Sequence, residues 1–444
     1  MIEDSFLLIR RGIMWIISRF CLILAIFLVF LSSLSAQFAG GSGSATDPWQ
    51  IETIEHLNNI RVYLGEEHND KHFVQIADLD LGISPWNEGG GWIAIGHYNN
   101  PFCGTVNGNG KIIQGIFINR PSDDYQGLFG LTNGAMLINI GLTNVDIYGD
   151  LYVGGLVGYN FDNTLIENCF SFGIVRGNSD VGGLVGHNSY SIVSNSYSSG
   201  NVLGNNSNIG GLIGLNSYST LINSYSKANV QGDFQVGGLV GYHFRAGIIH
   251  CYSTGVVSGS SGVGGLVGRR VTGGGFLDTN NYWNIETSGQ TSSSMGWGRT
   301  IEEMTYPYAV NTFEEWDFEH TWQLDENHET NQGYPYLRNL TYSLIEGELI
   351  TQPDRLAISN YPNPFNAKTT FRFYLPQKSL VNITIFNIKG EKVRSLLNEV
   401  QENGEFENYW NGLDDRGRFL PSGVYFYQLS TIKGTLSKKM IMIK

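Results

Sequence analysis

A six-residue block returns at nearly constant intervals through the middle of this 444-residue chain. It reads VGGLVG at Val153–Gly158 and recurs, at steps of 28, 28, 27 and 27 residues, at Val181–Gly186, Ile209–Gly214, Val236–Gly241 and Val263–Gly268. A degenerate copy, YQGLFG, lies at Tyr125–Gly130. Periods of this length are typical of solenoids, because one short unit cannot bury a core alone but stacked units can. The repeat therefore predicts a solenoid.

The repeats have the pattern of strands and not of helices. Most VGGLVG blocks are followed by a block of the type Asn-Ser-Tyr-Ser, as at Asn195–Ser198, and then by a segment such as Gly200–Val202. Apolar residues do not recur at i, i+3 and i+4, so no helical face is present. Three short β-prone stretches per repeat predict a right-handed parallel β-helix of about six coils, spaced ~4.8 Å apart. A leucine-rich repeat is disfavoured because the Leu-x-x-Leu-x-Leu pattern is missing.

Glycine and asparagine occupy fixed positions of the repeat. The repeat glycines, which suit turns and close approach between coils, are Gly154, Gly155, Gly158, Gly182, Gly183, Gly186, Gly210, Gly211, Gly214, Gly237, Gly238, Gly241, Gly264, Gly265 and Gly268. The asparagines form two series, Asn160, Asn188 and Asn216, continued by His243, and Asn168, Asn195 and Asn223, continued by His250. Since stacked amides can hydrogen-bond from coil to coil, we expect two structural asparagine ladders.

Aromatic rings recur in the same way, at Phe170, Tyr197, Tyr225 and Tyr252. The sequence leaves open whether these rings face inward or outward, because a turn at the preceding Asn resets the alternation of a strand. If they face outward, Tyr197, Tyr225 and Tyr252 are candidates for stacking on a sugar.

Charge divides the chain into two pieces that meet near residue 350. The formal net charge is -13, but residues 37–350 hold 11 basic and 30 acidic side chains, whereas residues 351–444 hold 13 and 8. An acidic chain disfavours nucleic acid as a partner, since phosphates require a basic surface.

The first 36 residues have the order of a secretory signal. Arg19 precedes an apolar run, Phe20–Leu31, and the small residues SSLSA follow. The run is short for a bilayer, so we expect cleavage between Ala36 and Gln37 and no transmembrane segment in the mature chain. An uncleaved N-terminal anchor is the alternative.

These repeats, with the trailing Asn-Ser-Tyr-Ser block, resemble the GLUG repeat of bacterial surface proteins. The resemblance covers most of residues 37–340 and includes the lead-in Asp47–Ile51 and the closing Gly333–Leu337. It implies a lead-in cap at 37–75, a β-helix at 76–285, and a C-terminal flank with linker at 286–350. It also implies a surface or secreted protein, and it brings no catalytic residues.

Residues 351–444 have a different pattern. Short strands such as Thr370–Leu375 and Gly423–Leu429, separated by turn residues, predict a small Ig-like β-sandwich. The motifs YPNPFN at 361–366, WNGLD at 410–414 and SGVYFY at 422–427 resemble the type A sorting domain of type IX secretion cargo. This implies the type IX machinery as partner, a Bacteroidetes-like Gram-negative cell, and export through the periplasm to the outer-membrane surface or the medium. An ordinary Ig-like accessory domain is the alternative.

The residues reveal no catalytic set, no metal set and no cofactor motif. The acidic residues of the regular coils occupy different positions of the repeat, so they do not stack on one another. No acidic groove is therefore expected there. Asp78 and Asp80 could bind Ca²⁺, but a turn or cap role is the simpler interpretation. His243 and His250 each replace an Asn of a ladder, which disfavours a shared metal. Cys169 and Cys251 lie three coils apart, too far for a disulfide, and should be buried free thiols.

Two functions follow from these features. The first is a non-enzymatic adhesin that contacts a glycan, matrix or surface protein. The alternative is a polysaccharide-degrading lyase or glycosidase, with its site in the loops of the acidic flanks, at 60–125 or 270–330.

Overall fold

The structure is a computed structural model that describes residues 37–338, 340, 343–345, 348–350, 357–361, 365–366, 368–375, 377–402, 404–432 and 434–443. The expected signal segment, its cleavage site at Ala36 and most of the linker lie outside these residues. The chain forms two compact units, Met1–Leu340 and Thr341–Lys444.

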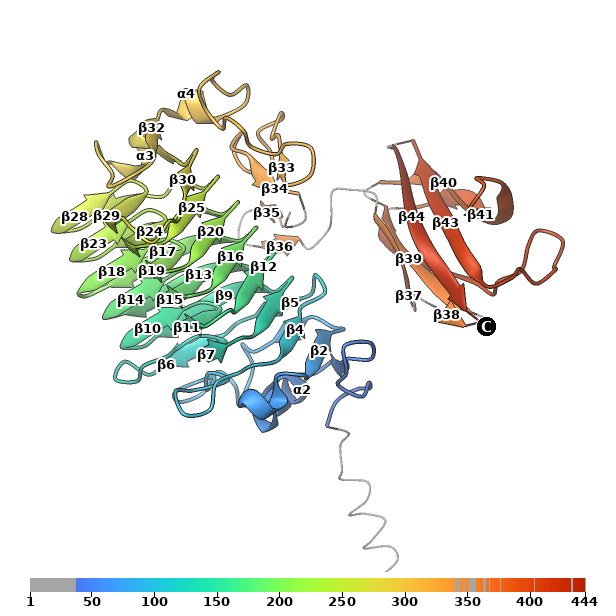
Figure 1. The fold of residues 1–444 in the computed structure, drawn as a ribbon, viewed down its shortest axis with the longest axis horizontal. Coiled ribbons are helices and arrows are strands. Elements are labelled where there is room, and N and C mark those ends of the chain that lie inside the picture. Colours follow the sequence, from blue (N-terminus) through green and yellow to red (C-terminus); the bar gives the residue numbers. More distant parts are fainter. Residues whose placement is uncertain are drawn as a thin grey trace, which may run out of the picture. The chain divides into compact units, whose positions relative to one another are not determined.

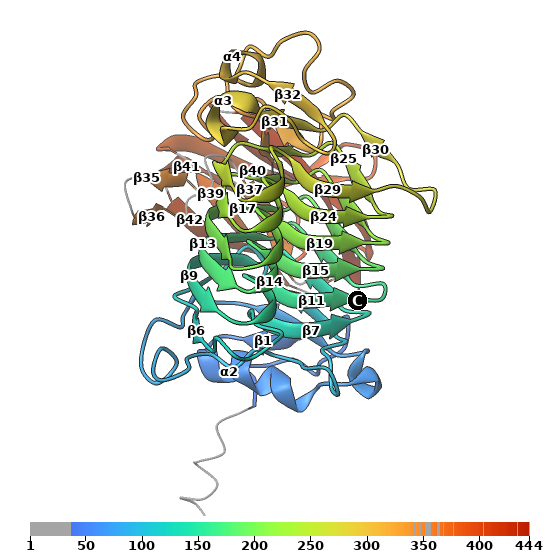
Figure 2. The same ribbon diagram turned by 90° about the vertical axis from the view of Figure 1, so that its left-hand side faces the viewer.

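The first unit is a parallel β-solenoid of about eight turns, which confirms the predicted fold class (Figures 1 and 2). One regular coil consists of β14 (Ser179–Gly182), β15 (Val185–Ser189), β16 (Ile192–Ser194) and β17 (Tyr197–Gly204). The prediction of three strands per repeat is wrong, because the Gly pair in each VGGLVG block turns a corner and divides the block between two sheets.

The four strands of each coil belong to four parallel sheets. The nine-stranded sheet contains β1 (Trp49–Ile51), β2 (His72–Gln75), β4 (Thr105–Asn107), β8 (Met136–Ile138), β12 (Leu165–Glu167), β16, β20 (Thr220–Ile222), β25 (Gly247–Ile249) and β30 (Asp278–Thr279). The five-stranded solenoid sheet contains β10 (Leu151–Gly154), β14, β18 (Ser207–Gly210), β23 (Phe234–Gly237) and β28 (Ser261–Gly264). The six-stranded sheet contains β7 (Phe129–Asn133), β11 (Val157–Phe161), β15, β19 (Ile213–Ser217), β24 (Val240–Phe244) and β29 (Val267–Val271).

The twelve-stranded sheet completes the solenoid. It contains β3 (Leu79–Asp80), β5 (Ile112–Gln114), β6 (Phe117–Asn119), β9 (Gly141–Tyr148), β13 (Phe170–Gly177), β17, β21 (Tyr225–Ser226), β22 (Asn229–Gln231), β26 (Tyr252–Ser253), β27 (Val257–Ser258), β31 (Tyr282–Asn284) and β32 (Trp297–Arg299). Identical positions of successive repeats pair directly, as Val153 with Val181 and Val181 with Ile209. The sequence period is therefore one turn of the solenoid.

The segments on either side of the repeats add to this stack. In the lead-in, β1 and β2 already pair in parallel, so the stack begins before residue 76. The helical segments there are α2 (Ile54–Asn59), η1 (Ile60–Val62) and η2 (Glu66–His68), and the C-terminal flank contains α3 (Ile285–Ser288), α4 (Ile301–Met304), β33 (Trp322–Gln323) and β34 (Tyr336–Leu337).

The repeat glycines occupy positions where a side chain has no room. A Cβ on Gly182 would lie 2.0 Å from the carbonyl oxygen of Val185, and one on Gly183 would lie 2.3 Å from that of Gly211 in the next coil. The leucine between the Gly pair and the next strand fills the core: Leu156, Leu184, Leu212, Leu239 and Leu266 are all fully buried. The corner therefore requires glycine where the backbones of neighbouring strands approach closely, and leucine where the side chain fills the core.

The first asparagine ladder runs through the core of the solenoid. Asn160 Nδ2 donates to Asn188 Oδ1 at 2.7 Å, and Asn188 Nδ2 donates to Asn216 Oδ1 at 2.9 Å. All three side chains are fully buried. At the N-terminal end of the ladder, Thr132 Oγ1 donates to Asn160 Oδ1. Asn160 and Asn188 are thus hydrogen-bonded through both their oxygen and their nitrogen, whereas Asn216 Nδ2, at the C-terminal end of the ladder, is buried without a hydrogen-bond partner among the described residues.

The second asparagine series has another cause. Asn168, Asn195 and Asn223 have φ of 53°, 47° and 49°, in the left-handed region that Asn tolerates better than most residues. Only part of the series hydrogen-bonds along the stack, since Asn168 Nδ2 donates to Asn139 Oδ1 but Asn195 Nδ2 donates to Glu167. The turn conformation, more than the ladder, accounts for asparagine here.

Cys103, Cys169 and Cys251 are free and buried, which confirms the prediction for the last two. Burial raises the pKa of Cys169 and of Cys251 to about 12. We expect neither thiol to react with a maleimide at neutral pH until the solenoid is unfolded, because the reactive thiolate is suppressed and the sulfur is covered. Peptide mapping after labelling in buffer and in denaturant checks this, and rapid labelling of folded protein at either residue would contradict it.

The second unit is a small β-sandwich preceded by a hairpin of β35 (Ser343–Ile345) and β36 (Glu348–Ile350). One sheet contains β37 (Ala357–Tyr361), β39 (Thr369–Leu375) and β42 (Gly404–Trp410), and the other contains β38 (Phe365–Asn366), β40 (Ser379–Asn387), β41 (Lys392–Gln401), β43 (Gly423–Thr431) and β44 (Gly434–Ile443). Both sheets contribute to one core, where the rings of Phe371 and Tyr427 lie 4.9 Å apart.

Candidate ligand-binding cleft

A cleft of about 210 Å³ opens at the C-terminal end of the solenoid, where the last repeat meets the flank. The last strand of the six-stranded sheet, β30 and the segment leading into β32 surround it. Its lining residues are Arg270, Asp278, Asn280, Asn281, Met295, Gly296 and Trp297.

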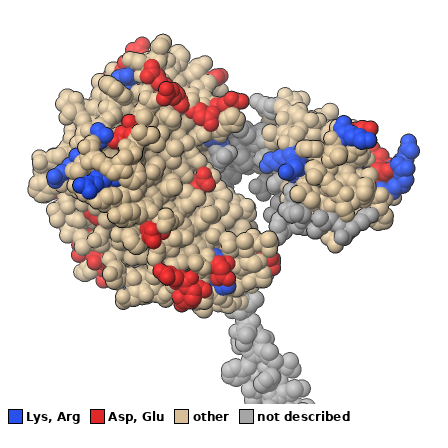
Figure 3. Space-filling model, viewed as in Figure 1, with Lys and Arg blue, Asp and Glu red and all other residues tan. Residues whose placement is uncertain are grey.

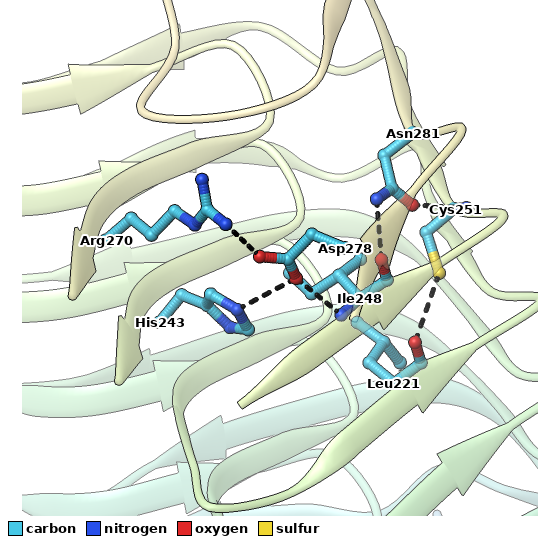
Figure 4. A network of polar contacts seen from close by, with 7 residues as sticks. All are labelled: Leu221, His243, Ile248, Cys251, Arg270, Asp278 and Asn281. Carbon is cyan, nitrogen blue, oxygen red and sulfur yellow. Dashed lines mark hydrogen bonds and ion pairs between the residues drawn. The ribbon is translucent and has the colours of Figure 1, made fainter. Parts of the chain in front are cut away.

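Asp278 is the centre of the polar side of this cleft (Figure 4). One carboxylate oxygen lies 3.2 Å from His243 Nε2 and accepts a hydrogen bond from the backbone N–H of Ile248, and the other pairs with Arg270. Burial raises the pKa of Asp278, but the contacts with His243, the Ile248 amide and Arg270 outweigh burial and keep the pKa below its ordinary value. Asp278 is therefore an ionised carboxylate that positions the Arg270 guanidinium at the cleft.

Asn281 and Cys251 have a structural role beside it. Asn281 Oδ1 accepts from the backbone N–H of Cys251, and its Nδ2 donates to the carbonyl oxygen of Ile248 (Figure 4). The Asn281 side chain is buried and thereby joins the last repeat to the flank. Both its oxygen and its nitrogen are thus engaged in this junction.

Trp297 is the apolar side of the cleft. It begins β32, pairs with Tyr282 of β31, and leaves 62% of its surface exposed. Next to it, Asn280 Nδ2 donates to the Glu314 carbonyl and to Glu315 Oε2, which fixes the cleft wall. An exposed indole beside ordered polar groups is the arrangement that a sugar ring requires for stacking and hydrogen bonding.

The candidate tyrosines Tyr197, Tyr225 and Tyr252 form a stacked ladder on the outer side of the solenoid. Ser198, which follows Tyr197 in β17, points inward, where its Oγ donates to the Gly211 carbonyl. Because neighbouring residues of a strand point to opposite faces, the tyrosine rings point outward. They stack on one another, with centroids 4.8 Å apart for Tyr197 and Tyr225 and 4.9 Å apart for Tyr225 and Tyr252. Tyr225 and Tyr252 are buried, and side chains of the C-terminal flank lie against both rings, so neither ring is accessible in this structure.

Tyr197 is half-buried, but its ring faces are also occupied. It stacks on Phe170 at 5.1 Å on one side and on Tyr225 on the other. A sugar stacks on the face of an aromatic ring. Because both faces of Tyr197 are covered by neighbouring rings, only the ring edge is open to a ligand. Trp297, which belongs to no such stack among the described residues, is the residue that the sequence argument missed.

Two further exposed arginines, Arg245 and Arg269, lie on the last two coils of the repeat, outside the cleft lining. Arg245 follows β24 and lies over the Phe244 ring, and Arg269 of β29 lies over the Tyr242 ring. Within the described part of the chain, no carboxylate lies within ion-pair distance of Arg245 or Arg269. With Arg270 they give this side of the solenoid a basic surface, and Figure 3 shows basic side chains gathered there.

A second polar group lies on the outer side of the six-stranded sheet. His187 Nδ1 is 3.2 Å from Asp180 Oδ2, and its Nε2 is 3.0 Å from Ser217 Oγ. These are the residue types of a nucleophile and its base, but the Ser217 hydroxyl donates to Ser189 and is buried. Ser217 lies in β19, which pairs with β15 on one side and with β24 on the other. The backbone N–H groups around Ser217 therefore bond within the sheet and cannot stabilise an oxyanion. The geometry fits a contact between coils better than hydrolysis.

The residues considered for metal binding have other partners. Asp78 accepts from the backbone N–H of Ile112, and Asp80 accepts from that of Gly82, as a turn role predicts. His243 contacts Asp278, whereas His250 lies against the Trp316 ring. No group of three or more His, Cys, Asp and Glu side chains suited to a metal ion occurs in the part of the chain that the structure describes.

Two family patterns match this chain. Residues 149–176, 177–203, 205–231 and 232–258 match the GLUG motif, and residues 359–444 match a secretion system C-terminal sorting domain. Both resemblances predicted from the sequence are confirmed. The sorting domain indicates export to the cell surface or secretion in Bacteroidetes-type Gram-negative bacteria, and interaction with the secretion machinery. Among the described residues, no helix has the length and apolarity needed to span a bilayer.

Relatives share parts of the chain. A putative Gly-rich membrane protein of Evansella cellulosilytica is 39% identical over 167 residues, which are 35% of this chain and 19% of that protein. Halomucin of Haloquadratum walsbyi is 31% identical over 143 residues, 31% of this chain and 2% of its own length. The chain thus spans less than a fifth of these relatives. An IgA1 protease structure aligns with 56% of this chain and 21% of its own, at 16% identity and a TM-score of 0.39.

Proposed function

We propose that this exported GLUG-repeat protein is a surface binding module that holds a glycan in the cleft beside Trp297. The observation that carries the proposal is the 62% exposed indole next to the ion-paired Arg270 and Asp278. Stacking on the indole supplies apolar contact, and the guanidinium supplies hydrogen bonds to hydroxyl or carboxylate groups. The rest of the solenoid acts as a rigid support.

The neighbouring arginines favour an acidic glycan over a neutral one. Arg245, Arg269 and Arg270 lie on two adjacent coils of a unit that is otherwise rich in acids. An acidic sugar stacked on Trp297 would meet the Arg270 guanidinium first, and Arg245 and Arg269 add positive charge to the same end of the solenoid. Such contacts weaken as salt is added, which separates them from stacking.

Trp297→Ala tests the site directly. We expect this change to weaken binding of an acidic oligosaccharide about tenfold, since an aromatic contact of ~1.4 kcal/mol corresponds to that factor in Kd. Tyr98→Ala is the matched control, because Tyr98 is a similarly exposed ring (72%) outside the cleft. Titration calorimetry of the full chain measures both variants, and equal affinities for the two would overturn the placement of the site.

A further inference from the structure

The half-buried Lys227 and the buried Asn331 and Asp325 form a polar group between the solenoid and its C-terminal flank. Lys227 follows β21, and its Nζ donates to Asn331 Oδ1 at 2.9 Å. Asn331 and Asp325 are 2% and 3% exposed. A buried amide and a buried carboxyl beside a half-buried lysine are unusual, because polar and charged groups are costly to remove from water.

Aromatic side chains enclose the amide and fix it. Asn331 Nδ2 donates to the Tyr252 hydroxyl at 2.7 Å and to the Pro335 carbonyl at 2.9 Å. Tyr252 and Trp322 are fully buried, with ring centroids 5.9 Å apart. The Asn331 carboxamide is therefore held in one orientation, with its oxygen toward Lys227 and its nitrogen toward Tyr252.

Asp325 fixes the loop that carries the amide. Its Oδ2 accepts from the backbone N–H groups of Asn331 and Gly333, both at 2.7 Å, and its Oδ1 accepts from that of Thr330. Burial lowers the pKa of Lys227, and the charge of Asp325 opposes this effect without cancelling it. Burial thus favours the neutral amine, which is the nucleophilic form of lysine.

We propose that Lys227 and Asn331 are joined by an intramolecular isopeptide bond. The Nζ lone pair attacks Asn331 Cγ and forms a C–N bond, and the Cγ–Nδ2 bond breaks. A proton lost by Nζ is taken up by Nδ2, which leaves as ammonia; the Tyr252 hydroxyl, which accepts from Nδ2, marks the side of the amide from which the ammonia departs. No redox change and no co-reactant is involved, and the product is a secondary amide.

This bond would tie together parts of the chain that are 104 residues apart. It would hold the flank over the tyrosine ladder, where Tyr252 and Trp322 pack. A covalent closure of a long loop restricts the unfolded chain, as a disulfide does, without depending on redox conditions. An exported protein with no disulfide among its described cysteines would gain durability from it.

Mass spectrometry of the denatured, full-length protein tests the proposal. We expect the measured mass to be about 17 Da below the mass calculated from the amino-acid sequence, because one ammonia is lost. We also expect trypsin to fail after Lys227 and to release one branched peptide containing both Lys227 and Asn331. The branched peptide is the deciding signal, because ammonia loss at Gln37 or at another asparagine would not produce it.

Lys227→Arg is the control, because arginine keeps the positive charge and a donor for Asn331 but is not a nucleophile. This variant should lack the branched peptide. A wild-type protein that is folded by circular dichroism, is cleaved after Lys227 and has an unmodified Asn331 would overturn the proposal. That result does not depend on whether any variant folds.

Discussion

Replacing Asn188 by Ala is expected to lower the free energy of unfolding of the solenoid by about 4 kcal/mol. The change leaves Asn160 Nδ2 without its acceptor and Asn216 Oδ1 without its donor, both in a fully buried place. Each orphaned polar group costs roughly 1–3 kcal/mol, and the lost volume adds a cavity. Urea denaturation followed by circular dichroism measures the effect.

Asn206→Ala is the matched control for this prediction. Asn206 is an exposed residue of the same solenoid, so its side chain remains solvated when the fold is intact. We expect its substitution to change the unfolding free energy by less than about 0.5 kcal/mol. Similar values for the two variants would mean that the core ladder contributes nothing beyond an ordinary surface asparagine.

Gly182→Ala is expected to destabilise the solenoid by about 3 kcal/mol or more, although it adds a single methyl group. The new Cβ would lie 2.0 Å from the Val185 carbonyl oxygen and 2.7 Å from that of Leu212. Both are backbone atoms of paired strands, so relief requires the corner to move in two coils. The midpoint of thermal unfolding reports the loss.

The same substitution at Gly40 provides the comparison. There the nearest atoms to a new Cβ, at 3.1 Å, belong to the flexible end of the Gln50 side chain. We expect a small effect at Gly40, since that side chain can move aside. If Gly182→Ala were as stable as Gly40→Ala, the steric explanation of the repeat would be wrong.

The stacking of coils could be predicted because it follows from local chemistry. A strict period places Asn188 between Asn160 and Asn216, whatever the rest of the chain does. The number of strands per coil was missed because a Gly pair is compatible both with a straight segment and with a corner. Only the hydrogen bonds between coils distinguish the two.

The direction and accessibility of the tyrosine ladder could not be predicted for a different reason. Tyr252 is buried by Trp322, Pro335 and Asn331, which come from a non-repeating segment about 80 residues later. A period carries no information about such a contact. The cleft has the same origin, since Trp297 and Asp278 also lie after the last repeat.

We propose that this exported solenoid binds an acidic glycan and releases it unchanged. Titrating the full chain against a panel of neutral, uronate-containing and sulfated oligosaccharides, while assaying new reducing ends, tests it most directly. We expect saturable binding of an acidic member, weaker at higher salt, with no new reducing ends. Turnover of any glycan, or failure to bind every acidic member, would contradict it.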